Sequence, residues 1–210
     1  DDQLIEKLGH PNVWMRETAQ RVLQERNDGE MATRLLEQVT QGPEGTTSLS
    51  RHALFAFAGH DVERFGLSYH PLKPLLNHSD PWMRSWAIRI FGQHYYTNPQ
   101  NTQSENSSDS PIVTSALDDE AAIVRLQAVM VVGKYTPLSL YPVSYERALA
   151  RAMAKSPTDF HFARIVWQTL KALLKEDRET GKRFLEAISS HPSPAGEEVT
   201  ARLIDYLATQ

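Results

Sequence analysis

The sequence predicts an all-α fold, an α-α superhelix of five to six helix pairs stacked side by side with a right-handed twist. One observation is a long pattern that occurs twice. "LGHPNVWMRETAQRVL" starts at Leu8 and "LNHSDPWMRSWAIRIF" starts at Leu76, with histidine, Trp-Met-Arg and alanine at the same spacings. A second observation is that apolar residues recur at helical spacing, with no alternating strand pattern. Together these observations predict a protein built from helical repeats.

Further copies of the pattern lie between and beyond these two, and an arginine marks each copy. The arginines are Arg16, Arg51, Arg84 and Arg125. Counted from each arginine, positions three and six or seven are almost always apolar or small, which predicts one buried stripe along a helix. We expect Arg164 to mark a fifth copy and residues 193–210 to close the series more weakly.

A shorter apolar segment precedes most of these helices, so each copy predicts a pair of helices. The segments are 31–39, 71–77, 110–117, 145–153 and 181–189. Asn12, Asp80 and Asp118 stand where a short polar side chain caps a following helix, and Pro81 suits a first helical turn. One pair cannot cover its own apolar stripe, whereas a stack buries a continuous core. We therefore expect one domain over residues 1–210.

One polar segment interrupts the repeats. It reads "YYTNPQNTQSENSSDSP" and lengthens the spacing between two marking arginines. Such composition cannot bury enough apolar surface to order itself. We expect a flexible insert at about residues 96–110.

Composition narrows the classes of function. The chain has 210 residues, 40% of them hydrophobic, a net charge of −4 and no cysteine. The missing cysteine excludes disulfides and cysteine-ligated zinc, and the negative charge argues against nucleic acid as the main partner. No apolar run approaches the ~20 residues that cross a bilayer. The chain begins "DDQLIEKL", so we expect a mature protein or a segment cut from a longer one.

The period, the leucine, the arginine after the turn and the alanine beyond it resemble HEAT repeats over nearly the whole chain. A narrower likeness lies in "LIEKLGHPNVWMRETAQRVLQERND" and "SLSRHALFAFAG". These stretches are similar to the HEAT segment of planctomycete-type proteins labelled membrane-bound dehydrogenases or haem-binding proteins.

In that family a sugar-dehydrogenase-like β-propeller precedes the HEAT segment, and a cytochrome c module with a CxxCH site follows it. This chain has no CxxCH and no propeller blades. The resemblance therefore implies architecture and a role as a spacer or interaction arm. It implies a periplasmic or extracytoplasmic location, and it transfers no cofactor or catalytic residue.

Histidines and tryptophans at repeated positions suggest sites, but a structural interpretation is favoured for most of them. His10 and His78 recur without the His-Glu pairs of metal-binding HEAT proteins, so we expect them to hydrogen-bond in the turn. Trp14 and Trp82 also recur, which indicates packing between repeats. Trp86 has no tryptophan counterpart and is a candidate partner contact.

The marking arginines can likewise be interpreted as structural residues or as a binding site. We expect Arg16, Arg51, Arg84 and Arg125 to form a structural ladder, each reaching an acid or a helix C-terminal carbonyl in the next repeat, rather than an anion-binding track. Positions two and five after each arginine are expected to point away from the buried stripe, onto a concave binding face. The candidate partner-binding residues on that face are Trp86, Arg89, Arg21 and Met130.

The sequence contains no GxSxG, no Gly-rich phosphate loop and no nucleophile–His–acid cluster, so we expect no catalysis, no cofactor and no metal. The predicted function is a non-catalytic scaffold or protein-interaction module. Its partner is expected to be another protein or a neighbouring domain, not nucleic acid or a membrane. One alternative is a HEAT-like DNA glycosylase, which needs a basic concave groove. Another is a chromophore-lyase-like or chaperone role, which needs an apolar concave patch.

Overall fold

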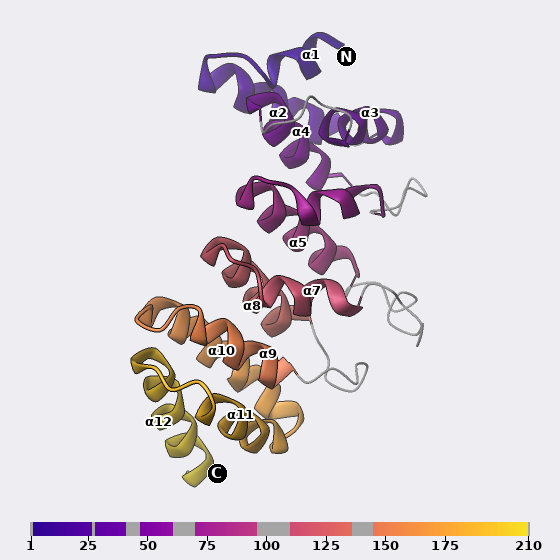
Figure 1. Ribbon diagram of the computed structural model, residues 1–210. Helices are drawn as coiled ribbons and strands as arrows, with labels where there is room; N and C mark the ends of the chain where they lie inside the picture. Colours follow the sequence, from indigo (N-terminus) through magenta and orange to yellow (C-terminus); the bar gives the residue numbers. More distant parts are fainter. Residues whose placement is uncertain are drawn as a thin grey trace. The chain divides into compact units, whose positions relative to one another are not determined.

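The computed structural model describes residues 2–26, 28–40, 47–60, 70–95, 110–135 and 145–209. All regular secondary structure in these ranges is helical (Figure 1), which confirms the all-α prediction. The predicted insert at 96–110 lies outside the described ranges, apart from the residue with which a helix begins.

Within the described ranges, the elements fall in chain order into six successive pairs of a first and a second helix. The pairs are α1 (Asp2–Lys7) and α2 (Val13–Arg26), α3 (Gly29–Thr40) and α4 (Ser48–Ala58), η2 (His70–Asn77) and α5 (Pro81–Tyr95), α7 (Ser110–Leu117) and α8 (Ala122–Tyr135), α9 (Tyr145–Ala154) and α10 (Phe160–Glu176), and α11 (Glu179–Ser189) and α12 (Pro194–Ala208). Five of these are α-helical pairs, and η2 is a 3-10 helix. Pro74 inside η2 lacks the N–H that an α-helical ladder requires.

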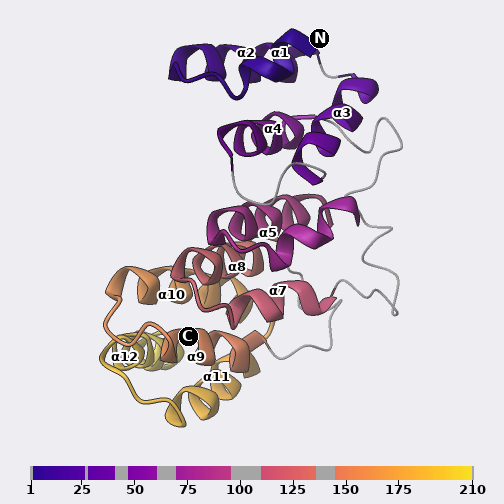
Figure 2. The same ribbon diagram turned by 45° about the horizontal axis from the view of Figure 1, so that its top comes forward.

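The chain divides into two compact units, Asp1–Ile90 and Phe91–Gln210, which are described separately. In unit 1, α1 packs against α2 and α3 packs against α4, while α2 and α4 also contact each other. In unit 2, α8 packs against α10, and α10 packs against α12. The first helices α9 and α11 lie side by side, which can be followed in Figure 2.

The predicted apolar stripe is the buried side of the second helices. Its members are fully or almost fully buried: Ala19 and Leu23 on α2, Leu54 and Phe57 on α4, Ala87 and Ile90 on α5, and Ala128 and Val131 on α8. Helical spacing places these positions on one side of each helix, so a single stripe is removed from water. Burial of large apolar side chains stabilises a fold by roughly 1.5–3 kcal/mol each.

The fifth copy is shifted by one residue from its predicted register. In α2, α4, α5 and α8 the backbone N–H of the marking arginine donates to the carbonyl of the residue four before it. In α10 this bond joins Ala163 to Asp159, whose carboxylate also caps the helix at Phe162. The residue of α10 that matches the marking arginines is therefore Ala163, and the prediction of Arg164 is wrong. The reason is that the cap at Asp159 starts α10 one residue earlier than that prediction required.

Candidate functional site

The repeated pattern builds a turn that an arginine fastens to its own helix. In the first copy, Nη1 of Arg16 donates to the carbonyls of His10 and Pro11, at 2.7 and 2.8 Å. In the second copy, Nη1 of Arg84 donates to the carbonyls of His78 and Ser79, at 2.7 and 3.2 Å. These carbonyls lie beyond the end of the preceding helix and have no helical partner, so the guanidinium satisfies them.

Arg125 repeats this geometry in unit 2. Its Nη1 donates to the carbonyls of Asp119 and Glu120, at 2.9 and 2.8 Å, which stand six and five residues before it as in the other two copies. Arg125 is only 3% exposed. A buried guanidinium is tolerated when carbonyl and hydroxyl oxygens surround it.

The histidine of the pattern supplies an acceptor inside the turn. Nδ1 of His10 accepts from the backbone N–H of Asn12, and Nδ1 of His78 accepts from that of Asp80, both at 3.0 Å. This confirms the prediction that the two histidines hydrogen-bond in the turn. At the matching position, unit 2 has Asp119 instead of a histidine. The carboxylate of Asp119 accepts from the backbone N–H of Ala121, two residues later, at 2.8 Å.

Two of the three predicted caps are confirmed. Oδ1 of Asn12 accepts from the N–H of Trp14, and Oδ1 of Asp80 accepts from that of Trp82, both at 2.9 Å. The prediction for Asp118 is wrong. Its carboxylate instead receives the guanidinium of Arg151 from α9, with a shortest contact of 2.7 Å. That hydrogen bond lowers the pKa of Asp118.

Two of the marking arginines, Arg51 and Arg125, also reach the next helix pair by direct contacts. Nη2 of Arg51 contacts the carboxylate of Asp80 at 2.8 Å. Nη2 of Arg125 donates to the carbonyl of Lys155, just after α9 ends, at 3.0 Å, and to the hydroxyl of Ser156 at 2.7 Å. Arg51 and Arg125 thus each join their own helix to the next pair through donors of fixed geometry.

Arg16 reaches the next pair through a histidine. Its Nε donates to Nε2 of His52 at 3.2 Å, and Nδ1 of His52 lies 3.0 Å from Oε1 of Gln20. This arrangement requires the neutral imidazole with its proton on Nδ1. Burial, followed by the charge of Arg16, lowers the pKa of His52, and Glu17 opposes this shift.

Aromatic side chains fill the junction between α4 and α5. The ring of Phe55 meets Trp82 and Trp86 edge to face, with centroids 4.9 and 4.3 Å away. Arg51 lies 5.1 Å above the Trp82 ring and Arg89 lies 4.7 Å above the Trp86 ring. All three rings are half-buried, so the cluster packs two second helices and still reaches the surface.

The predicted binding positions do not share one open face. Trp86 is half-buried on Phe55, whereas the candidate residues Arg21, Arg89 and Met130 are exposed. At the matching positions of α4, Ala53 and Ala56 are fully buried, which contradicts the expected orientation. The two alanines are buried because α4 has packed neighbours on more than one side, contacting both α2 and α3.

Large exposed apolar side chains gather in the first turns of second helices. They are Val13 and Trp14 on α2, Ile123 on α8 and Phe160 on α10. Trp14 is the most exposed of them, at 64%. Its counterpart Trp82 is half-buried, because the preceding helix α4 covers it. Within the described residues, no element precedes α2 except the short α1, and no aromatic ring contacts Trp14.

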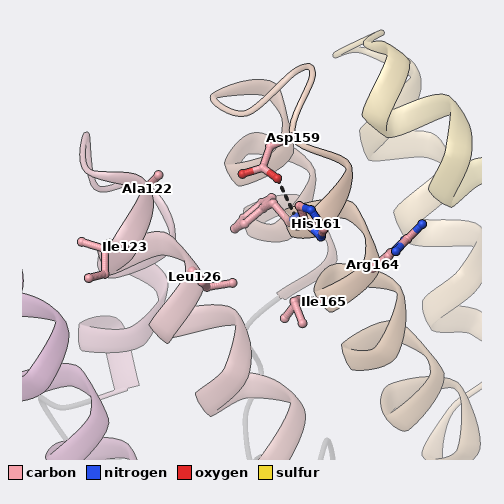
Figure 3. A pocket seen from close by; sticks show the side chains of 8 residues that line it. Ala122, Ile123, Leu126, Asp159, His161, Arg164 and Ile165 are labelled. Atoms are coloured by element: carbon pink, nitrogen blue, oxygen red, sulfur yellow. Dashed lines mark hydrogen bonds between the residues drawn. The ribbon is translucent and has the colours of Figure 1, made fainter.

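A pocket of about 440 Å³ opens between the first turns of α8 and α10. Figure 3 shows Ile123 and Leu126 on the α8 side and His161 and Ile165 on the α10 side. Sequence reasoning missed this pocket. The remaining lining residues are Ala122, Asp159, Phe162 and Arg164.

Within the described ranges, no three histidine, aspartate or glutamate side chains gather as metal ligands. In the same ranges, no helix has the length and apolar character needed to cross a membrane. Comparison of the chain with protein-family models, with curated proteins and with solved structures finds no match.

Proposed function

We propose that this chain is a HEAT-repeat scaffold, in which the first turn of α2 holds another protein or a neighbouring domain of the same protein. Its role is binding rather than catalysis. The recurring turn supports the repeat architecture, because three arginines make the same pair of carbonyl contacts at the same spacing. The resemblance to planctomycete-type proteins is the basis for proposing an extracytoplasmic location.

The observation that carries the binding role is the contrast between Trp14 and Trp82. The two residues hold the same position in the same turn, and each follows a capping residue that accepts its N–H. Trp82 meets a phenylalanine ring of the preceding helix, whereas Trp14 is 64% exposed. Trp14 is thus exposed at a repeat position where the other tryptophan is packed. Tryptophan is enriched among residues that dominate binding energy, so Trp14 is the candidate anchor for a partner.

Neighbouring side chains extend this surface. Val13 adds a second exposed apolar side chain, and Arg21, two turns further along α2, is exposed with only a 3.9 Å contact to Glu25. An apolar anchor with a polar surround is how protein-binding surfaces are commonly composed. The partner surface that fits is a helix or loop presenting an aromatic ring, as Phe55 does to Trp82.

Affinity capture tests the proposal. The whole chain is immobilised and exposed to an extract of its source cells, in parallel with the variant Trp14→Ser. We expect a defined protein to be retained by the wild type and lost from Trp14→Ser, with the far-ultraviolet circular dichroism of both chains equal. The matched control is Ile204→Ser, which removes another exposed apolar side chain at 52% exposure, on α12.

Retention of the same proteins by Trp14→Ser would reject the α2 surface as the binding site. Turnover of a substrate by the purified chain, lost on changing residues of its surface, would reject the non-catalytic role.

A further inference from the structure

The turn before α2 and the turn before α5 are built alike, bond by bond. Oδ1 of Asn12 accepts the N–H of Trp14, and Oδ1 of Asp80 accepts that of Trp82, both at 2.9 Å. In each helix the backbone N–H of the marking arginine donates to the carbonyl of the same capping residue at 3.3 Å. The two turns therefore present their tryptophans in the same way, and the contacts of Trp82 indicate which group such a turn receives.

A preceding helix covers Trp82 through two side chains that stand four residues apart. Phe55 of α4 meets the Trp82 ring edge to face, with 4.9 Å between the centroids. Nη2 of Arg51 donates to Oδ2 of Asp80 at 2.8 Å. Residues four apart lie on the same side of a helix, so one helix supplies both groups. The occupant of this kind of turn is thus a helix that offers a ring to the tryptophan and a polar partner to the capping residue.

The first turn of α2 keeps the tryptophan but reverses the polarity of the capping residue. Asn12 has one side-chain oxygen where Asp80 has two. That oxygen accepts the N–H of Trp14, so the atom of Asn12 that matches Oδ2 of Asp80 is the amide Nδ2. An amide nitrogen donates and does not accept. A helix that copied α4 would set the guanidinium of its arginine against this donor.

The exposed surface around Asn12 favours a hydrogen-bond acceptor on the partner. Asn12 is exposed, and among the described residues its Nδ2 makes no hydrogen bond. A carboxylate is the strongest acceptor that a helix can offer to an amide. At the position of Trp86, α2 has Thr18, so an incoming ring meets one indole rather than two. The polar contact therefore has a larger share in choosing the partner than it has at Asp80.

We propose that the first turn of α2 binds a helix of a partner protein that carries a glutamate and, four residues later, an aromatic side chain. The carboxylate accepts from Nδ2 of Asn12, and the ring packs edge to face on Trp14. Side chains at one-turn spacing are a common means by which a helix is recognised. The assignment rests on the proposed binding role of α2 and adds the chemistry of the partner.

The probe is a capped alanine–lysine peptide of about 17 residues, which is long enough to be helical in water. It carries glutamate and phenylalanine four residues apart, with the lysines on the other side. The peptide is titrated into the whole chain, which is isotope-labelled at its tryptophan indoles. We expect the indole N–H signal of Trp14 to shift and saturate. This signal is identified by its absence from the Trp14→Ser variant.

Two altered peptides separate the ring from the acceptor. The peptide with alanine in place of phenylalanine should leave the Trp14 signal unmoved, because the ring supplies the apolar contact. The peptide with arginine in place of glutamate should bind about threefold more weakly, as expected for the loss of an exposed polar pair.

The variant Asn12→Asp tests the capping residue itself. It supplies the two oxygens that Asp80 has, so the cap of α2 is kept. We expect the preference to reverse, with the arginine peptide bound about threefold more tightly than the glutamate peptide. Gln168→Glu is the matched control, because it makes the same change of amide to carboxylate at an exposed position of α10 in unit 2. It should keep the wild-type preference.

Three results overturn the assignment. The glutamate–phenylalanine peptide leaves the Trp14 signal unmoved, or the folded Asn12→Asp variant keeps the wild-type preference, or the indole shifts follow the concentration of the chain without any peptide. The last result gives the surface to a second copy of this chain. The proposed function fails separately, when Trp14→Ser retains the same captured proteins as the wild type. A captured protein that depends on Trp14, together with a failed peptide titration, overturns only the chemistry assigned to the partner.

Discussion

Nε of Arg16 donates to Nε2 of His52 at 3.2 Å, and this bond joins α2 to α4. The acceptor exists only while the imidazole is neutral. Protonation would replace the hydrogen bond by two facing donors and two like charges. The contact between α2 and α4 therefore depends on the neutral form of His52, whose pKa is lowered in the folded chain by burial and by the charge of Arg16.

Stability should fall on acidification through this histidine. Burial lowers the pKa of His52 in the folded chain, with Arg16 acting in the same direction. A depressed folded pKa gives stability that is complete above the unfolded value of about 6.5 and is lost as pH falls below it. Urea unfolding at pH 7.5 and pH 5 measures this loss. The variant His52→Gln should lose less between the two pH values, and an equal loss in both chains would remove His52 as a cause.

The histidine of the turn should be replaceable by a short acceptor. His78 accepts the N–H of Asp80 through Nδ1, and Asp119 makes the same bond with a carboxylate. We expect His78→Asn to keep the free energy of unfolding within about 0.5 kcal/mol and His78→Leu to lower it by about 1 kcal/mol. Chemical denaturation compares them. Equal losses in both variants would show that the imidazole is needed for something other than its acceptor atom.

Arg125 should be the most costly of the marking arginines to remove. It donates to three carbonyls and to the hydroxyl of Ser156, and it is 3% exposed. Arg125→Met should lower the free energy of unfolding by about 3–5 kcal/mol, since buried acceptors lose their partner. Arg164→Met, on the exposed side of the neighbouring helix, should change it by less than about 0.5 kcal/mol. Similar values for the two variants would contradict the structural role of Arg125.

The close packing of α8 against α10 depends on a glycine. A Cβ at Gly133 would lie 2.6 Å from Oγ1 of Thr169, whose hydroxyl donates to the carbonyl of Val129 at 3.1 Å. Gly133→Ala should therefore destabilise the chain by about 1–3 kcal/mol, despite the higher helix propensity of alanine. In a Thr169→Ala background the same change should cost clearly less, because the clashing oxygen is gone. A stabilising Gly133→Ala substitution in the wild type would show that the helices separate freely.

The sequence predicted those parts of the structure that depend on local spacing. Leu54 and Phe57 are buried because helical periodicity places them on one side, and His10 bonds within a turn that its neighbours define. The side that faces a neighbouring helix was not predicted. Ala53 and Ala56 carried the signal, since paired small residues permit close helix approach, but their burial depends on the helices that pack around α4.

The pocket was missed for a related reason. The pocket is lined by His161 and Ile165, which are smaller than Trp82 and Trp86 at the matching positions of α5. This match is found only when Ala163, not Arg164, is aligned with Arg84. Taking Arg164 as the marker placed the comparison one residue too far along α10. The cap at Asp159 was the signal that corrects it, because a capping residue sets where a helix begins.

The most direct measurement compares the two tryptophans that share one repeat position. The free energy of unfolding is determined by urea denaturation for the wild type, Trp14→Ser and Trp82→Ser. Trp82→Ser should lose about 2–4 kcal/mol, because it removes a ring packed on Phe55, and Trp14→Ser should stay within about 0.5 kcal/mol of the wild type. This result leaves Trp14 free to serve a partner. A loss for Trp14→Ser as large as that for Trp82→Ser would show that Trp14 is part of the folded core, and would contradict the binding surface on α2.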